Sequence, residues 1–436
     1  GLAAIRPGTE RSSPGNALLT ETWNYFGSGT WTVGDHDIKF GAEYSQSEIY
    51  NFFLQDSWGN YSFYVPLVNG ASDFGNLLRG QYFDYDLQTN PTDPSAIAAR
   101  YKNKSMGFFV QDTWYVTPNL TLTLGVRADK PEASPNPPYN ECFAAAPGTV
   151  NAACGTGYTG GFGIANNNTY NGDYIIQPRF GFNYTFDSER SMQLRGGVGL
   201  FQGDAPNVWV GNAYSSTGMN YVSYQNLSAW QTVPFSADGL NQNVPTTPGA
   251  GVRNVNAISD DFELPSVWKA NLAIDVETPW NGIVASAELL LTDVKNGLFY
   301  RSLNVGPGYL GPDGRVLYWN PNSPRPFGNT SSCQNNSNPC NAPNTTITNG
   351  ARYNRNAYFG DVFLLENTNK GKGQQLTVSL TKAFSTESDW SWSLGYTRTN
   401  AEEVSALTSS TAGSGYGSQL GSTINEPTSS TARYDV

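Results

Sequence analysis

The stretch GFFVQDTWYVTPNLTLTLGVRAD, residues 107–129, contains two segments of alternating apolar and polar residues joined by a short Thr-Pro-Asn turn. Before the turn, where Asp112 interrupts the row, the recurring apolar residues are Phe108, Val110, Trp114 and Val116. After the turn they are Leu120, Leu122, Leu124 and Val126. Alternation with a period of two predicts β-strands that have one apolar and one polar face. Each segment reaches the length of about 9–11 residues that a tilted strand needs to cross a bilayer.

The same hairpin pattern recurs in four other stretches, at residues 22–48, 177–201, 266–291 and 373–400. Long segments rich in polar residues separate the hairpins, at about residues 49–100, 130–173, 202–262, 302–370 and 401–429. Compact soluble sheets rarely carry repeated loops of this length. Outer-membrane barrels combine short periplasmic turns with long extracellular loops. We therefore predict an all-β fold in which residues 1–436 form part of one transmembrane antiparallel β-barrel domain.

The composition fits such a barrel. Charged residues make up 14% of the 436 residues, against roughly 25% in a soluble domain. Aromatic residues make up 13%, and several lie close to the predicted turns, as in the aromatic girdles of membrane barrels: Trp114, Tyr115, Trp280, Trp390 and Trp392. The sequence has no run of about 18 apolar residues that would form a transmembrane helix. Its formal net charge of −11 argues against a nucleic-acid partner.

The four cysteines form two close pairs in Asn/Pro/Gly-rich segments, Cys142 with Cys154 and Cys333 with Cys340. Disulfide bonds within each pair would staple the long loops and indicate an oxidising compartment. Four cysteines allow three connectivities, and proximity in sequence favours the local one. Zinc binding is the alternative, although the sequence has neither a CxxC motif nor a histidine near these cysteines.

Five stretches resemble, in the correct order, the hairpins of TonB-dependent outer-membrane receptors. They are GDHDIKFGAEYS, VQDTWYVTPNLTLTLGVRAD, QPRFGFNYTF with SMQLRGGVGLFQG, PSVWKANLAIDVETPWNGIVASAELLLTDVKNGLFYRSLN, and ENTNKGKGQQLTVSLTKAFSTESDWSWSLGYTRTNAEEV. The set is most similar to the Oar-like subgroup, whose members carry an N-terminal carboxypeptidase-regulatory-like domain. The resemblance covers most of the predicted strands, and the loops lie outside it.

This resemblance implies a Gram-negative outer-membrane receptor whose barrel has about 22 strands. Roughly 10–14 of these strands would lie in this chain, which lacks the family's plug, its TonB box and the last strands. Such a receptor binds and imports a bulky solute with energy from the TonB–ExbB–ExbD system, which acts through the plug. The partners would be outer-membrane lipid, the solute and the TonB system, with an accessory lipoprotein or other outer-membrane chains as further candidates. The resemblance implies no cofactor and no enzymatic activity.

Two sets of residues are candidates for function. The first set lies on the polar strand faces and is expected to face the barrel lumen: Arg127, Asp129, Arg179 and Arg195. Arg127 and Asp129 also fit a plain structural ion pair. The second set comprises loop aromatic residues that would contact a ligand or pack the loop: Trp209, Tyr214, Tyr221, Tyr224 and Trp230. The single histidine, His36, lies in a predicted polar turn, which argues against a catalytic triad or a histidine-based metal site.

Two other functions stay open on the residues alone. One is a passive porin or an adhesin-like barrel without energy coupling. The other is a secreted soluble all-β binding protein or enzyme. The need for detergent during extraction separates the membrane proteins from the soluble one, and a plug and TonB box upstream of residue 1 would separate a receptor from a porin.

Substitution of Leu122 by arginine tests the predicted lipid-facing row. A cation at mid-bilayer on the lipid face costs roughly 2–4 kcal/mol, whereas one in the lumen stays hydrated. We expect Leu122→Arg to lower the free energy of unfolding in lipid vesicles far more than Thr123→Arg. Equal losses in the two variants would contradict the assignment of the faces.

Overall fold

A computed structural model gives the fold of the chain. The structure describes residues 3–7, 10–68, 71–90, 93–170, 172, 174–228, 230–246, 251–280, 282–305, 309–310, 316–317, 356, 358–384, 389–405, 409–419 and 430–431. No helix in this described part of the chain is long and apolar enough to cross a membrane.

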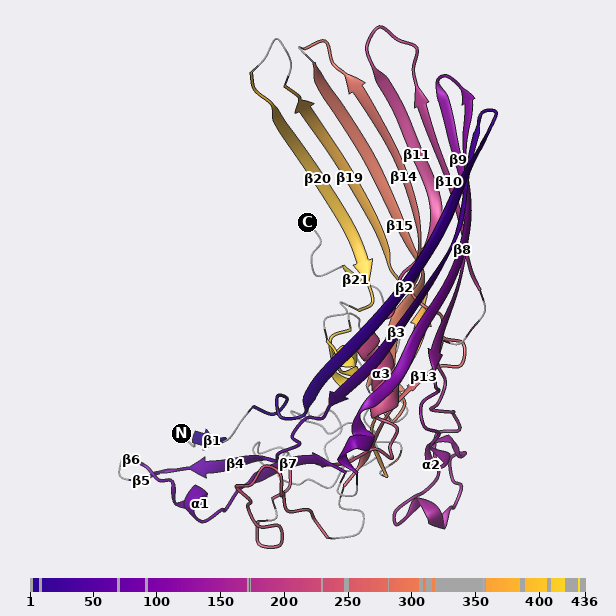
Figure 1. The fold of residues 1–436 in the computed structure, drawn as a ribbon. Helices are drawn as coiled ribbons and strands as arrows, with labels where there is room; N and C mark the ends of the chain where they lie inside the picture. The colour runs from indigo at the N-terminus through magenta and orange to yellow at the C-terminus, as the bar shows by residue number, and fades with distance from the viewer. Residues whose placement is uncertain are drawn as a thin grey trace.

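Long antiparallel strands dominate the described residues and form a 13-stranded sheet (Figure 1). Its main path follows β2 (Asn16–Val33), β3 (His36–Phe53), β8 (Ala99–Thr117), β9 (Leu120–Ser134), β10 (Ile175–Thr185), β11 (Met192–Gln202), β14 (Ser266–Glu277), β15 (Ile283–Ser302), β19 (Lys372–Lys382), β20 (Trp392–Glu403) and β21 (Ser430–Thr431). The sheet curves around a concave face, and its described path ends at β2 on one side and at β21 on the other. The predicted all-β membrane-barrel fold is confirmed.

The five predicted hairpins are confirmed by strand pairing. They are β2–β3, β8–β9, β10–β11, β14–β15 and β19–β20. All their turns lie at one end of the sheet, and the long connections lie at the other (Figure 1). Several strands extend further than the alternation predicts, because backbone pairing continues beyond the bilayer-crossing segment. His36 is the first residue of β3 and pairs with Val33, so it lies in a strand and not in a turn.

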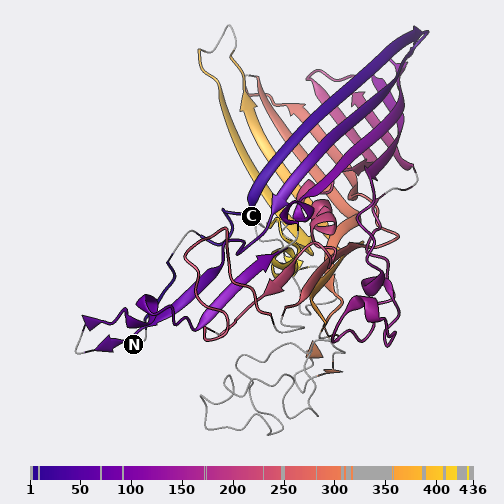
Figure 2. The same ribbon diagram turned by 60° about the horizontal axis from the view of Figure 1, so that its bottom comes forward.

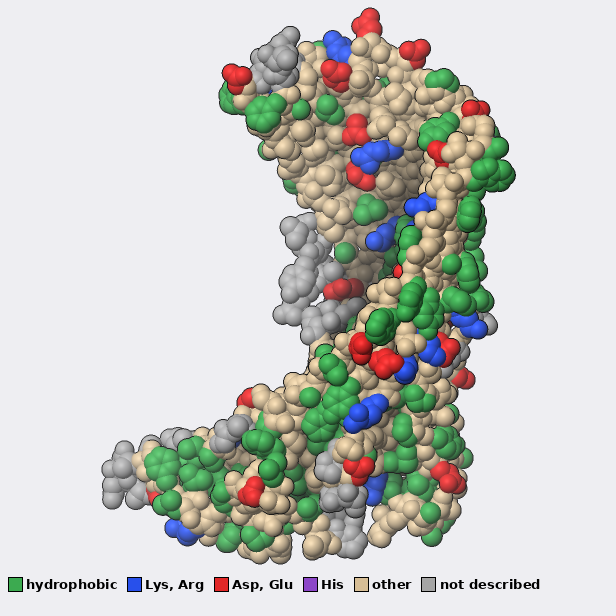
Figure 3. All heavy atoms as spheres, viewed as in Figure 1, with side chains coloured by type: hydrophobic (Ala, Val, Ile, Leu, Met, Phe, Trp, Pro, Cys, Tyr) green, Lys and Arg blue, Asp and Glu red, His purple; other side chains and the backbone are tan. Residues whose placement is uncertain are grey.

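The strand register separates the two faces of the sheet. Phe40 pairs with Val110, and Val110 pairs with Val126, so these side chains lie on the same face. Their exposed fractions are 51%, 43% and 40%, which are high for apolar side chains in the middle of a sheet. Figure 3 shows such apolar side chains forming a strip along the convex edge of the sheet. A lipid-facing surface of an outer-membrane barrel has this composition.

Asp112, which interrupts the apolar row, lies on this same convex face near the turn end of β8. Its Oδ2 lies 2.8 Å from the Nδ1 of His36, and the His36 ring stacks on Trp114 with centroids 5.3 Å apart. The pair gives the carboxylate a polar partner close to the membrane interface, where the cost of a charged group is lowest.

The long connections fold into smaller elements at the end opposite the turns (Figure 2). One sheet contains β1 (Ala3–Ile5), β4 (Asn60–Val65), β7 (Asp84–Thr89) and β12 (Val222–Tyr224). A parallel pair is formed by β13 (Arg253–Ile258) and β18 (Phe359–Thr368), and β18 also pairs with β15. The two-residue pairs are β5 (Leu67–Val68) with β6 (Ala71–Ser72), and β16 (Tyr309–Leu310) with β17 (Val316–Leu317). The helices are α1 (Gly75–Leu78), α2 (Glu141–Ala144), α3 (Asn207–Ser215) and α4 (Ala412–Gly417), with 3-10 turns η1 (Pro94–Ile97) and η2 (Ala152–Cys154).

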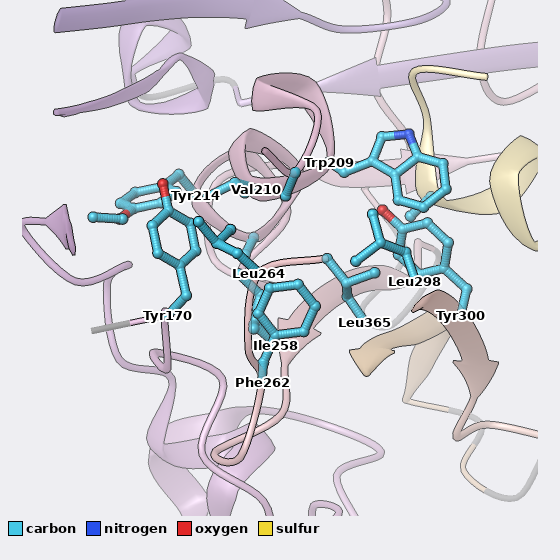
Figure 4. Close-up of a cluster of buried hydrophobic side chains, with 14 of the residues drawn as sticks. Tyr170, Trp209, Val210, Tyr214, Ile258, Phe262, Leu264, Leu298, Tyr300 and Leu365 are labelled. Atoms are coloured by element: carbon cyan, nitrogen blue, oxygen red, sulfur yellow. The ribbon is translucent and has the colours of Figure 1, made fainter. Parts of the chain in front are cut away.

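These elements share buried cores. The largest, named here the cap core, joins α3 and α4 to the ends of β8, β15 and β18; its residues include Tyr170, Trp209, Tyr214, Ile258, Tyr300 and Leu365 (Figure 4). A second core lies between β4 and β7 and contains Tyr61, Phe63, Tyr82, Tyr85 and Leu87. The stretches predicted as loops 49–100, 202–262 and 302–370 thus contain strands and helices with buried side chains. Those of the cap core pack against the ends of β8, β15 and β18.

Candidate functional site

A polar hollow of ≈ 710 Å³ lies where the concave face of the barrel wall meets the folded loops. Residues from β3, β8, β9, β10, the end of β11 and the segments before β10, α3 and β14 line it: Glu43, Ser45, Ser47, Asn103, Lys104, Ser105, Arg127, Asp129, Pro131, Tyr170, Gln177, Arg179, Gln202, Gly203, Asp204, Ala205, Pro206, Asn207 and Leu264. Strand alternation directs the side chain of Lys104 to the opposite, convex face. Figure 3 shows acidic and basic side chains on the visible concave surface. The lining offers charged groups of both signs together with hydroxyl and amide groups.

Arg127 and Asp129 form the centre of this hollow. They lie two residues apart on β9, so strand alternation places both on the concave face. The Nε of Arg127 lies 2.7 Å from Asp129 Oδ2, and its Nη2 lies 2.7 Å from Asp129 Oδ1. The same Nη2 donates to Glu43 Oε2 of β3 at 3.0 Å. Gln177 of β10 donates to Asp129 as well, so the network links three strands.

Arg179 differs from Arg127 in its partners. No carboxylate in the described part of the chain lies within ion-pair distance of its guanidinium. The Nη2 of Arg179 reaches Gln177 Oε1 at 3.5 Å, and the guanidinium lies over the ring of Phe201, 4.6 Å from its centroid. Arg179 therefore presents a positive charge to the hollow that is available to an anionic group of a ligand.

The rim of the hollow is a chain of hydrogen bonds towards α3. The Tyr170 hydroxyl donates to Asn103 Oδ1 at 2.5 Å, and Asn103 Nδ2 donates to Asn207 Oδ1 at 2.6 Å. Burial raises the pKa of Tyr170 well above its ordinary value, so the hydroxyl stays protonated and remains a donor. This rim fixes the distance between the barrel wall and α3.

Arg195 also lies on the concave face but belongs to a separate group. Its Nε lies 3.2 Å from Asp275 Oδ2, and Ser286 Oγ donates to Asp275 Oδ1 at 2.6 Å. The structure thus brings three of the predicted lumen-facing residues, Arg127, Asp129 and Arg179, into one hollow and leaves Arg195 outside it. The contribution of these residues to ligand binding stays a prediction.

The predicted loop aromatic residues fall into two groups. Trp209 and Tyr214 are buried in the cap core, with exposed fractions of 2% and 4%. Figure 4 shows both side chains among the apolar residues of this core. Tyr224 and Trp230 pack against the core between β4 and β7, and Tyr221 lies 3.3 Å from the Ser216 hydroxyl. The structure does not bring the five together at one surface, and ligand contact by them stays a prediction.

The structure adds residues that the sequence interpretation did not single out: Glu43, Asn103, Tyr170, Gln177 and Asn207. Strand alternation places Glu43 and Gln177 on the polar face, so that signal was sufficient to find them. Tyr170 and Asn207 lie in segments predicted as loops, where no periodicity indicates the direction of a side chain.

The predicted bond between Cys142 and Cys154 is confirmed, and it closes the loop that carries α2. Cys333 and Cys340 lie outside the described residues. Among the residues that are described, no group of three His, Cys, Asp or Glu side chains is arranged to hold a metal ion.

Gly107 provides a test of the Arg127 network, because it pairs with Asp129 directly beneath it. A Cβ at Gly107 would lie 2.4 Å from Asp129 Oδ1 and 2.6 Å from Arg127 Nη2. We expect Gly107→Ala to displace the ion pair and to lower the free energy of unfolding in lipid by about 1–3 kcal/mol. Gly181→Ala on β10 is the matched control, since its Cβ would have no neighbour closer than 3.7 Å. Equal stability of the two variants would show that the pair shifts without cost.

A comparison with known protein families agrees with this barrel fold. Residues 5–435 match the family described as the outer membrane beta barrel domain. No curated protein matches the chain. Among solved structures, the outer membrane transporter YddB from Escherichia coli is 11% identical with a TM-score of 0.43, and the match covers 89% of this chain and 34% of that one.

Two further solved structures are similar. For the siderophore receptor PirA from Pseudomonas aeruginosa the identity is 12%, the TM-score is 0.34, and the coverage is 89% of this chain and 53% of that one. For the copper transporter OprC the corresponding values are 10%, 0.37, 88% and 42%. This chain therefore spans from about a third to about half of the length of these proteins. On the strength of the family match over residues 5–435, the chain belongs to the outer membrane beta barrel domain family, and its place is the outer membrane of Gram-negative bacteria.

Proposed function

We propose that this chain is part of the barrel of an energy-coupled receptor that binds a bulky solute outside the cell and imports it. The observation that carries the proposal is the ≈ 710 Å³ polar hollow at the junction of the barrel wall and the folded loops. Its lining of hydroxyl, amide and charged groups suits a large hydrophilic solute. Its position, at the end of the barrel opposite the short turns, corresponds to the extracellular mouth.

The barrel of this receptor contains more strands than those described. The described sheet is curved but open between β2 and β21, and an exposed sheet edge has no hydrogen-bond partners within a membrane. We infer that further strands of the same protein close the barrel, which makes its lumen wide. A lumen of this width is plugged in outer-membrane transporters, since an open one would leak small solutes.

Coupling to TonB is supported by the sequence of the hairpins, which resemble those of TonB-dependent receptors and most closely the Oar-like subgroup. In the proposed receptor, a plug domain and a TonB box lie outside residues 1–436. The paired charges of Arg127 with Asp129 and of Arg195 with Asp275 line the wall that would face the plug. An accessory lipoprotein on the extracellular side is a further proposed partner.

Uptake by the intact protein tests this function. Cells that produce the full-length protein are given fluorescein-labelled pools of peptides and of oligosaccharides too large for general porins. We expect uptake of a component of one pool, with equal loss of that uptake when the gene for this protein or the gene for TonB is deleted. A component that still enters through the protein in cells without TonB would identify a passive barrel, and an absence of any difference on deletion of this gene would overturn the transport proposal.

A further inference from the structure

Four basic side chains form a row on the convex face of the sheet, at the end of the strands nearest the extracellular loops. The row consists of Arg100, Lys102 and Lys104 of β8 and Lys130 of β9, and is named here the cationic row. Alternation puts the three residues of β8 on the same face as Phe108 and Val110, and Lys130 joins them because it pairs with Met106. Successive residues on one face of a strand lie about 7 Å apart, so the four cations form a continuous line.

The row lies at the upper boundary of the lipid-facing surface. Towards the turns, the convex face of β8 and β9 is apolar from Met106 and Ala128 onward, apart from Asp112 near the turn end of β8. Aromatic side chains lie along this boundary on the neighbouring strands. Tyr44 of β3 pairs with Met106, Trp23 of β2 pairs with Gln46, which in turn pairs with Lys104, and Tyr174 directly precedes β10. Such aromatic residues lie at the level of lipid headgroups. The cationic row begins at the level of these aromatic residues, and Figure 3 shows basic and acidic side chains below the apolar strip.

Two of the four cations have carboxylate partners on the surface. Lys102 forms an ion pair with Glu48, and the side chains are 46% and 47% exposed. Lys104 lies 3.2 Å from Glu132, with side chains 32% and 43% exposed. Exposed pairs of this kind contribute little to stability and exchange partners easily. A phosphate group that carries more negative charge than a carboxylate therefore competes well for both lysines.

The two outer cations contact aromatic rings instead. Arg100 lies 4.5 Å from the ring centroid of Tyr50, and Lys130 lies 5.7 Å from that of Tyr174. Within the described residues no carboxylate forms an ion pair with either of them. An aromatic ring attracts a cation but does not neutralise its charge. Arg100 and Lys130 therefore keep their positive charges near the level of the headgroups.

We propose that the cationic row binds the phosphate groups of a lipid in the outer leaflet of the outer membrane. The occupant is a lipid and not a soluble anion, because the row continues directly into the apolar surface of Met106 and Phe108, which would hold the acyl chains of the same molecule. The acidic neighbours Glu48 and Glu132 limit the attraction to non-specific anions and leave multivalent phosphates as the preferred ligand. The lipid would fix the depth and tilt of this side of the barrel in the membrane.

Lipid binding by the full-length protein tests the proposal. The protein is purified in detergent, stripped of lipid and incubated with bisphosphorylated lipid A or with the same lipid after removal of its phosphates. Bound lipid per protein is measured by mass spectrometry, with and without excess inorganic phosphate. We expect the wild type to retain the phosphorylated lipid several-fold better than the dephosphorylated one, and inorganic phosphate not to displace it.

The variant for this test replaces Lys102, Lys104 and Lys130 together by glutamine, and Lys372→Gln is the matched control. Lys372 begins β19 at the same end of the barrel and is also paired with a carboxylate, Glu402, at 3.7 Å, but lies outside the cationic row. We expect the triple variant to lose the preference for phosphorylated lipid and Lys372→Gln to keep it, with both variants showing the circular dichroism of the wild type. Undiminished preference in a folded triple variant would overturn the proposal. Displacement by inorganic phosphate would overturn it in favour of a soluble anion, and equal retention of both lipids by the wild type would assign binding to the apolar surface alone.

Discussion

The structure depends on the pairing of every backbone N–H and C=O group inside the membrane. Lipid offers no hydrogen-bond partner, and each unpaired group costs several kcal/mol there, on the order of the net stability of a small protein. Antiparallel strands joined by tight turns satisfy the requirement between neighbours, and the register from β2 to β20 does so almost without interruption. A shift of one residue in any of these strands would turn its apolar row towards the lumen and its charges towards lipid. The alternation in the sequence and the hydrogen-bond register therefore enforce each other.

Several charges on the concave face occur in groups. Arg127 contacts two carboxylates, and Arg195 lies near Asp275 and Glu288. These ion pairs link β3 with β9 and β11 with β14 on the concave side of the sheet. Arg179 lies in the same hollow as Arg127 and has no carboxylate partner among the described residues.

The hairpins were predictable because lipid on one side and water on the other impose an unbroken alternation over the length of a bilayer. Leu120 to Val126 on β9 and Phe180 to Tyr184 on β10 are examples, and both fall on the convex face as the pattern indicates. That signal ends where the strands leave the membrane. Beyond it, α3 and the parallel pair of β13 with β18 are determined by packing between distant segments, as the contact of Trp209 with Tyr300 illustrates. The hollow is lined partly by membrane strands and partly by the segments beyond them. Its strand residues could be recognised from the alternation, whereas Tyr170 and Asn207 could not.

The cap core has a mechanical consequence for the loops at the end opposite the turns. Trp209 of α3 donates a hydrogen bond to the backbone oxygen of Ser409, and Tyr214 on the same helix donates one to that of Pro135. Loops that are widely separated in sequence are thereby joined into one body with a shared apolar interior. A displacement of a single loop would expose this interior to water, which costs roughly 25 cal/mol for each Å² of apolar surface. In the proposed receptor, these loops would therefore move together as one body, and a loop would not move independently of its neighbours.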